Sequence, residues 1–279
     1  MKKSEEVIES VIRRAATESA VLQGADIPSS VLTESERQNV TVLNLENKEI
    51  TDLAPLSGLK NLKFLRLGNN AVSDLKPLSG LFQLEGIGLY NNRVSDLSPL
   101  GGLSKLERLL LDNNQISDLA PLRRLGNLQR LGLNENKITD ITPLAGLRNL
   151  EILALWGNRI ENISPLGGLR KLQDLYLQNN QLRSLSPLAN MKSLKHLVLK
   201  GNLISNLMPL LGLEQLEHLD LADNQIGNLA PIEQLTRLNT LDLRDNSQLS
   251  RSEIIKVKKA LPRKWLGLRT KCIIHHNAE

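Results

Sequence analysis

The sequence predicts an elongated α/β solenoid, a fold in which one short unit repeats and stacks along an axis. Two ladders of residues support this prediction, because both keep a spacing of 22 residues over most of the 279-residue chain. The first ladder consists of Pro55, Pro77, Pro99, Pro121, Pro143, Pro165, Pro187, Pro209 and Pro231. The second consists of Asn70, Asn92, Asn114, Asn136, Asn158, Asn180, Asn202, Asn224 and Asn246. Two ladders in phase indicate one repeated structural unit.

Each repeat is expected to combine a short strand with a tight turn. The L-x-L segment alternates between inward and outward positions, which predicts one parallel strand per repeat and about ten strands in all. The D-L-x-P-L-x-x-L half spaces its leucines three apart, which favours a 3-10 turn or an extended connection over an α-helix. Proline fits such a turn because it fixes φ and donates no hydrogen bond. Strands stack only ~4.8 Å apart, so the array should curve with the sheet on its concave face and the bulkier turns on its convex face.

The N-terminal segment lies outside the ladders and is expected to cap the array. A helix over residues 5–16 would place Ile8, Val11, Ile12 and Ala15 on one apolar face, which should cover the open end of the first repeat. Thr33 then begins an S/T-x-x-E capping box, which predicts a short helical turn. We therefore assign residues 1–38 to an N-terminal helical cap.

The first repeat departs from the asparagine ladder, because it carries Lys48 at that position. Inside the stack, an asparagine amide is expected to satisfy backbone groups of the adjoining turns. At the end of the array one adjoining turn is missing, so lysine fits an end repeat.

The repeat array is predicted to span residues 39–249 and to be closed by a C-terminal cap over residues 250–279. Ser250 begins a second capping box, which opens a helix that runs to Leu261 and is ended by Pro262. Residues 271–275 are apolar and β-branched, which favours a final edge strand.

Two motifs within the repeat are specific enough to indicate a family. An L-x-x-L-x-L-x-x-N core occurs at Leu150, Leu153, Leu155 and Asn158, and an I-x-D-L-x-P-L segment occurs at residues 116–122. Together they resemble the leucine-rich repeat family, and within it the 22-residue subclass of bacterial internalins and a eukaryotic phosphatase regulatory subunit. The resemblance covers roughly residues 40–249 and implies a right-handed horseshoe in a bacterial, internalin-like protein. The immunoglobulin-like module and wall-attachment signal of internalins have no counterpart here, which argues against a surface adhesin.

Charge and cysteine content restrict the functional classes. The net charge of +5 comes from residues 251–279, which hold eight basic and two acidic side chains, whereas the other 250 residues hold 27 basic and 28 acidic ones. The single cysteine, Cys272, excludes an internal disulfide and fits a reducing compartment. The N-terminus lacks the apolar core of a secretory signal, and no apolar run is long enough for a membrane span. We therefore expect a cytoplasmic monomer, with export by another route left open.

The outward positions between the core leucines are the candidates for function. Ile152, Ala154 and Val198 lie around Trp156 and Tyr176 on three adjacent predicted strands. A contiguous apolar patch rich in Trp and Tyr is typical of a binding surface, with the two aromatic residues as anchors. Exposed aromatics can also support a sheet by cross-strand stacking, which is the alternative interpretation. The predicted partner-binding residues are Phe64, Tyr90, Leu110, Ile152, Trp156, Asp174, Tyr176, His196, Val198, His218 and Asp220.

A polar strip borders the apolar residues and includes Asp174, His196, His218 and Asp220. The two histidines lie on adjacent strands, so a divalent metal bridging them with a carboxylate is one interpretation. A solvated rim that contacts a partner is the preferred one, and no metal or cofactor is predicted.

Motifs of enzymes are missing from the sequence. There is no local nucleophile motif, and Gly86-Ile-Gly88 lacks the third glycine and the helix of a dinucleotide site. The predicted function is a non-catalytic scaffold that binds a protein or peptide on its concave face. Two alternatives stay open. One is nucleic-acid or acidic-membrane binding through the basic residues 256–271, and the other is an engineered or consensus-like repeat protein without a natural ligand.

Overall fold

The computed structural model describes residues 2–22 and 33–261, except for the side chains of residues 17–22. The chain divides into two compact units, Met1–Asn136 and Lys137–Glu279, called the N-terminal and C-terminal units below. The predicted edge strand at residues 271–275 and the thiol of Cys272 lie outside the described residues.

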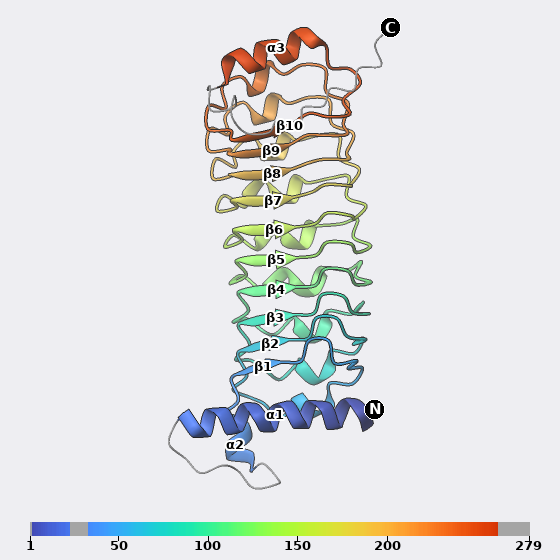
Figure 1. Ribbon diagram of the computed structural model, residues 1–279, viewed down its shortest axis with the longest axis vertical. Helices are drawn as coiled ribbons and strands as arrows, with labels where there is room; N and C mark the ends of the chain where they lie inside the picture. The colour runs from blue at the N-terminus through green and yellow to red at the C-terminus, as the bar shows by residue number, and fades with distance from the viewer. Residues whose placement is uncertain (1, 23–32, 262–279) are drawn as a thin grey trace. The chain divides into compact units, whose positions relative to one another are not determined.

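The N-terminal unit contains two helices followed by parallel strands that alternate with 3-10 turns (Figure 1). The helices are α1 (Lys2–Leu22) and α2 (Glu34–Gln38). The strands are β1 (Val42–Asn44), β2 (Phe64–Arg66), β3 (Gly86–Gly88), β4 (Arg108–Leu110) and β5 (Arg130–Gly132), and the turns are η1 (Ala54–Leu56), η2 (Lys76–Leu78), η3 (Ser98–Leu100) and η4 (Ala120–Arg124). Each strand pairs with the next in a register of one repeat, so that Val42 lies opposite Phe64.

The C-terminal unit repeats this order and ends in a helix. Its strands are β6 (Ile152–Ala154), β7 (Asp174–Tyr176), β8 (His196–Val198), β9 (His218–Asp220) and β10 (Thr240–Asp242). Its turns are η5 (Thr142–Gly146), η6 (Ser164–Gly168), η7 (Ser186–Leu188), η8 (Met208–Leu210) and η9 (Ala230–Ile232), and its helix is α3 (Arg251–Ala260). Short parallel strands, 3-10 turns and helical caps confirm the predicted fold class.

The core of each repeat is made of leucine and isoleucine. In β6, Leu153 and the following Leu155 are fully buried, whereas Ile152 and Ala154 are partly exposed. The same alternation holds along the other strands except at Gly86 of β3 and Gly132 of β5, which neighbouring side chains cover, so the L-x-L motif separates core from surface as predicted. Each buried leucine contributes about 1.5–3 kcal/mol through removal of apolar surface from water.

The asparagine ladder satisfies backbone groups of the preceding repeat. Asn180 Oδ1 accepts a hydrogen bond from the backbone N–H of Ile160 at 3.0 Å, and its Nδ2 donates to the carbonyl oxygens of Leu155 and Leu177, both at 3.0 Å. The amide therefore joins its own strand to the repeat before it. The first repeat has no repeat before it, which explains why Lys48 replaces asparagine there.

The residue three positions after the end of each strand adopts a left-handed backbone conformation, which turns the chain toward the 3-10 segment. These residues are Asn47, Asn69, Asn91, Asn113, Glu135, Gly157, Asn179, Gly201, Asp223 and Asp245. Their φ angles lie between 51° and 68°, a region that asparagine, aspartate and glycine tolerate best. The conformation explains why this row of the repeat is rich in these residue types.

Helix α1 covers the first repeat as predicted, but it is longer and its buried stripe differs. It spans Lys2–Leu22, and it contacts β1 and η1. Ile8 and Ile12 are fully buried and Ala16 nearly so, whereas Val11 and Ala15 are only half-buried. The residues of α1 that pack on the first repeat are therefore spaced four apart, because residues at this spacing lie on one face of a helix.

Polar contacts fix the two N-terminal helices in place. Arg37 of α2 pairs with Glu9 of α1 at 2.9 Å and donates a hydrogen bond to the carbonyl oxygen of Pro55. The capping box at Thr33 is complete, because its hydroxyl accepts from the N–H of Glu36 and its own N–H donates to the Glu36 carboxylate.

Helix α3 closes the C-terminal unit. The Ser250 hydroxyl accepts from the N–H of Glu253 at 3.2 Å, as the predicted capping box requires. The carboxylate of Glu253 is used differently from the prediction, because it accepts from the N–H of Leu229 at 3.2 Å and pairs with Lys256 at 2.7 Å. It thereby ties the cap to the turn of the last repeats. None of the described helices is both long and apolar enough to cross a membrane.

Candidate partner-binding face

The outward positions of the strands and of the two residues after them form the strand face of each unit. In the C-terminal unit, Ala154, Tyr176 and Val198 lie side by side in the register of β6, β7 and β8. Ile152 and Trp156 flank Ala154 along the chain, and all five side chains are partly exposed. We call these five residues the apolar patch, and the structure brings them together as the sequence predicts.

A buried acceptor lies beside the apolar patch. The carbonyl oxygen of Gln178 accepts from the N–H of Gly157 at 3.0 Å, which places Gln178 next to Trp156. Within the described residues, the side-chain oxygen of Gln178 is buried and has no hydrogen-bond donor. Such orphaned acceptors are rare in proteins. Sequence reasoning missed Gln178, because its position in the repeat is otherwise an ordinary outward one.

The polar strip is a continuous row across four strands. Asp174 Oδ1 and His196 Nδ1 lie 2.5 Å apart, and the His196 and His218 ring centroids are 4.8 Å apart. His218 Nδ1 shares a hydrogen bond with the Thr240 hydroxyl. These four residues occupy matching positions in β7 to β10 and form one row joined by hydrogen bonds and a tilted ring contact, whereas Asp220 of the predicted strip lies beside this row on β9.

A metal ion held by this row was one interpretation of the sequence. In the part of the chain that the structure describes, no group of three or more His, Cys, Asp or Glu side chains is placed to hold a metal ion. The geometry therefore gives no support to a metal bridging His196 and His218.

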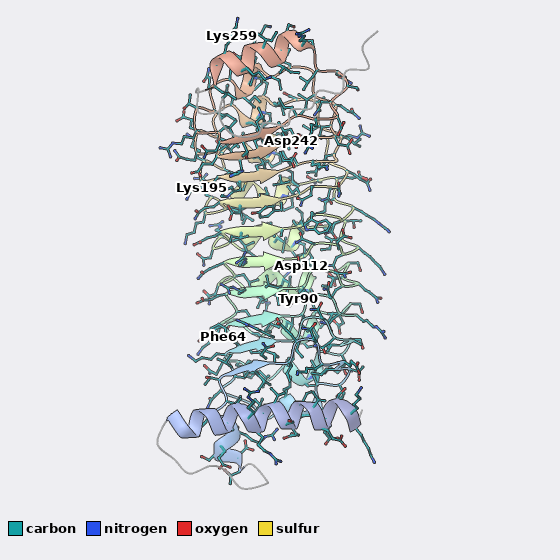
Figure 2. The ribbon with its side chains drawn as sticks, viewed as in Figure 1. Phe64, Tyr90, Asp112, Lys195, Asp242 and Lys259 are labelled. Atoms are coloured by element: carbon teal, nitrogen blue, oxygen red, sulfur yellow. The ribbon has the colours of Figure 1, made fainter. Side chains whose placement is uncertain are left out.

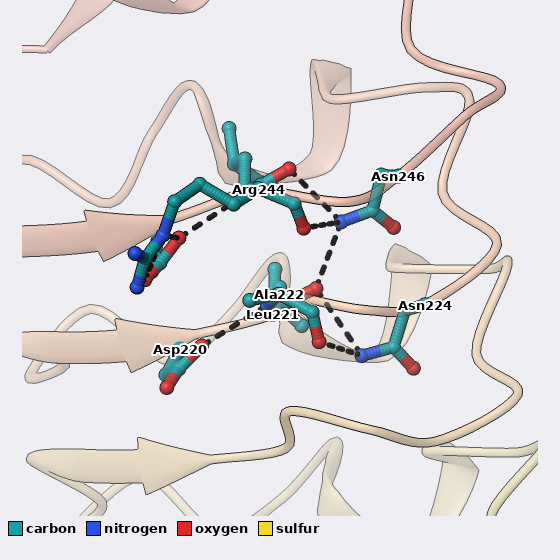
Figure 3. A network of polar contacts seen from close by, with 8 residues as sticks. Asp220, Leu221, Ala222, Asn224, Arg244 and Asn246 are labelled. Atoms are coloured by element: carbon teal, nitrogen blue, oxygen red, sulfur yellow. Dashed lines mark hydrogen bonds and ion pairs between the residues drawn. The ribbon is translucent and has the colours of Figure 1, made fainter. Parts of the chain in front are cut away.

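Two carboxylates on β9 and β10 differ in their electrostatic environment (Figure 3). Asp220 is half-buried and accepts one hydrogen bond, from the N–H of Ala222 at 3.0 Å. Burial raises its pKa and the nearby Asp242 adds to the rise, although Lys200 and Arg244 oppose it. Burial also acts to raise the pKa of Asp242, but hydrogen bonds from Arg244 outweigh burial and lower it. Of these two carboxylates, Asp220 is therefore the one whose charge is less compensated.

Phe64 and Tyr90 of the N-terminal unit, both labelled in Figure 2, lie on glycines of neighbouring repeats. A β-carbon at Gly86 would lie 2.8 Å from Phe64 Cδ1, and one at Gly68 would overlap the ring of Tyr90. The Tyr90 hydroxyl donates to Glu46 Oε1 at 3.1 Å, and burial followed by this contact raises the pKa of Tyr90. These rings lie over backbone at the two glycines, an arrangement compatible with the alternative of a supporting role in the sheet as well as with partner binding.

Leu110 at the end of β4 and Asp112 just after it continue this face. Leu110 is partly exposed and lies between Gly88 and Gly132 in the strand register. The Asp112 carboxylate covers Gly132 and accepts from the N–H of Asn134 at 3.1 Å. Burial raises the pKa of Asp112, and hydrogen bonds from Asn134 reduce that rise only in part.

Replacing Asp112 by asparagine is expected to raise the free energy of unfolding at pH 7 by less than about 1 kcal/mol. The raised pKa means that the folded state favours the protonated carboxyl, so the ionised form is a cost above the folded-state pKa. That cost fades as the pH falls below the pKa of the unfolded chain, about 3.9. Urea unfolding at a series of pH values should show the gain at pH 7 and none at pH 3.

The matched control is Asp96→Asn in the same unit. Hydrogen bonds from the Ser98 hydroxyl and N–H lower the pKa of Asp96, so ionisation stabilises the folded state. This substitution should therefore destabilise the protein at neutral pH, and the loss should shrink as the pH falls through the lowered folded-state pKa. Equal effects of the two substitutions would contradict the assignment for Asp112.

A few exposed apolar side chains lie outside the predicted site. Val42, Phe82 and Met208 are 53%, 58% and 57% exposed. Val42 lies opposite Phe64 in the register of β1 and β2, whereas Phe82 and Met208 lie on other repeats, and a few exposed apolar residues of this kind are normal on protein surfaces.

Comparisons with known proteins agree with the repeat geometry. The family described as Leucine Rich repeats (2 copies) matches residues 38–80, 83–124, 126–168 and 214–256. A second, described as Leucine rich repeat, matches residues 148–204 and 170–226. The comparison with curated proteins gave no match.

Solved structures extend the similarity to most of the chain. An internalin C2 from Listeria monocytogenes is 31% identical with a TM-score of 0.64, and the match covers 85% of this chain and 92% of that chain. The internalin InlF from the same species is 29% identical with a TM-score of 0.62, covering 92% of this chain and 88% of that chain. The plant peptide hormone receptor RGFR1, solved in complex with RGF2, shares the fold at 24% identity and a TM-score of 0.66, covering 76% of this chain and 37% of that chain.

Leucine-rich-repeat proteins of these kinds act in protein–protein interaction, and such scaffolds are typically non-catalytic. The matches cover most of the repeat array, and the strand register, the asparagine ladder and the 3-10 turns account for them in physical terms. The chain therefore belongs to the leucine-rich-repeat family, and its repeats are internalin-like.

Proposed function

We propose that this chain is a non-catalytic interaction scaffold whose strand face, expected to be concave, binds a protein or peptide. The observation that carries the proposal is the apolar patch of the C-terminal unit, in which Trp156 and Tyr176 are partly exposed among Ile152, Ala154 and Val198. Leucine fills the core of these repeats, so the two aromatic side chains are not needed there. Large aromatic residues on a solvent-facing apolar surface are favoured anchors for protein partners.

The framework under the patch supports this proposal, because it holds the anchors in a fixed geometry. The strands are joined in register, and each asparagine of the ladder adds buried hydrogen bonds between repeats. A surface that is already ordered loses little conformational entropy on binding. The polar strip beside the patch supplies the solvated rim that interfaces of this type have.

The proposal is tested by the double substitution Trp156→Ala with Tyr176→Ala. Affinity purification with quantitative mass spectrometry should recover partner proteins with the unsubstituted chain and at least tenfold less of them with the double variant, because each anchor is expected to contribute about 2 kcal/mol. Thermal unfolding should change little, since both side chains lie on the surface.

Phe82→Ala is the matched control, because Phe82 is an exposed aromatic residue outside the strand face. It should leave partner recovery unchanged. Recovery that survives the double substitution, or that falls equally with Phe82→Ala, would remove the apolar patch from the proposed function.

No specific observation in the described residues supports the alternative of nucleic-acid or membrane binding through residues 256–271. Within the described part of that segment, Lys256 is paired with Glu253 at the start of α3.

A further inference from the structure

The strand face of the C-terminal unit is acidic. The segments 151–157, 173–179, 195–201, 217–223 and 239–245 carry its strands and the residues that follow them, and they hold seven carboxylates against three cationic side chains. The carboxylates are Glu151, Asp174, Glu217, Asp220, Asp223, Asp242 and Asp245. Of the cations, Lys195 donates to Gln173 at 2.9 Å and Arg244 is held by Asp242, and the third is Lys200. The potential over this face therefore favours a positively charged partner.

The acidic surface is continuous with the apolar patch. Tyr176, Val198 and Asp220 occupy the same position on three successive paired strands. Since paired strands lie about 4.8 Å apart, the carboxylate follows Tyr176 by only two strand spacings, roughly 10 Å. A single bound segment can therefore contact both surfaces.

Two polar side chains beside the apolar patch, those of Asp220 and Gln178, have oxygen atoms that could accept further hydrogen bonds. Asp220 accepts one backbone hydrogen bond, and its burial raises its pKa. A cation placed beside this carboxylate would favour its charged form and offset the cost of burial. Within the described residues, the side-chain oxygen of Gln178 has no donor at all, and an unmet acceptor costs about 1–3 kcal/mol.

We propose that the partner of this face is a polypeptide segment that carries a lysine or arginine about four residues from an apolar side chain. The apolar side chain lies on Trp156 and Tyr176, and the cation lies beside Asp220. The spacing follows from the structure, because Trp156 follows β6 and Asp220 lies on β9, three strand spacings or roughly 14 Å away. The inference rests on the proposed function, because it assigns the chemistry of the partner at the same face.

The test is selection from a phage-displayed library of random peptides with the full chain as bait. Selected peptides should be enriched in Lys or Arg about four positions from an apolar residue, compared with the unselected library. Synthetic peptides from the enriched set should bind Asp220→Asn at least about tenfold more weakly than the unsubstituted chain. Replacing the basic residue of the peptide by glutamate should abolish binding.

Asp140→Asn is the matched control, because it removes a carboxylate of the same unit that lies before η5, away from the strand face. It should leave the affinity of the peptides unchanged. Circular dichroism melting curves of both variants verify that the fold is retained.

The outcomes separate this inference from the proposed function. Peptides that need Trp156 and Tyr176, but show no basic enrichment or bind Asp220→Asn as well as the unsubstituted chain, overturn the inference and leave the scaffold proposal standing. Peptides whose binding is indifferent to the Trp156 and Tyr176 substitutions count against both, as does a selection that yields no binder. Enrichment of acidic peptides would overturn the charge argument directly.

Discussion

Replacing Asn180 by alanine should lower the free energy of unfolding by roughly 3–5 kcal/mol, because the substitution removes several buried hydrogen bonds at once. The substitution removes the acceptor for the N–H of Ile160 and the donors to the carbonyl oxygens of Leu155 and Leu177. Asn180 is only 8% exposed, so water replaces these bonds poorly. Urea denaturation followed by circular dichroism measures the loss.

Lys48→Asn is the matched control for the ladder, because it completes the motif in the one repeat that has no repeat before it. Its effect should stay within about 0.5 kcal/mol, as for an ordinary surface substitution. A loss of less than about 1 kcal/mol for Asn180→Ala would show that solvent or local rearrangement satisfies the freed groups.

Removing the apolar contacts of the N-terminal cap should lower the free energy of unfolding by at least as much. Ile8 and Ile12 are fully buried where α1 contacts β1 and η1, and an isoleucine-to-alanine change in such a site costs about 2–5 kcal/mol. The double substitution Ile8→Ala with Ile12→Ala should loosen α1 from the first repeat. Because repeats contact mainly their neighbours, the effect should be greatest at that end.

Hydrogen exchange measures this effect residue by residue. The amides of the first repeat, including that of Leu45, which donates to the Arg66 carbonyl oxygen, should exchange faster by at least tenfold, while amides of the C-terminal unit keep their rates. Glu6→Ala provides the control, because Glu6 is an exposed residue of the same helix. Unchanged exchange in the first repeat would mean that α1 does not protect it.

The fold was predictable because each repeat places the same residue types in the same surroundings. The ladder asparagines bind equivalent carbonyl and N–H groups in successive repeats. The 22-residue period of the sequence is therefore also the period of these contacts. The outward rows follow from the same period, which is why Trp156, Tyr176 and Val198 could be assigned to one surface before their positions were known. The continuous row from Asp174 to Thr240 follows in the same way.

Contacts that depend on side-chain conformation were beyond prediction. The position of a residue in the repeat says that Tyr90 faces outward, but not that its ring lies over Gly68 and reaches Glu46 two repeats earlier. Nothing in the capping-box motif indicates that Glu253 would bind the N–H of Leu229. The orphaned oxygen of Gln178 likewise arises from local packing, which has no signature in the period.

The direction in which the asparagine amides point has a consequence for folding during synthesis. Asn70 accepts from the N–H of Ile50, which lies 20 residues nearer the N-terminus, and every later ladder residue repeats this backward reach. As the chain leaves the ribosome, the backbone N–H of each repeat has no acceptor until the asparagine 20 residues later has been synthesised. At about 5–20 residues per second this delay is roughly one to four seconds. The newest turn therefore stays incomplete until the next repeat has been made, and the last of these bonds forms when Asn246 reaches the N–H of Ile226.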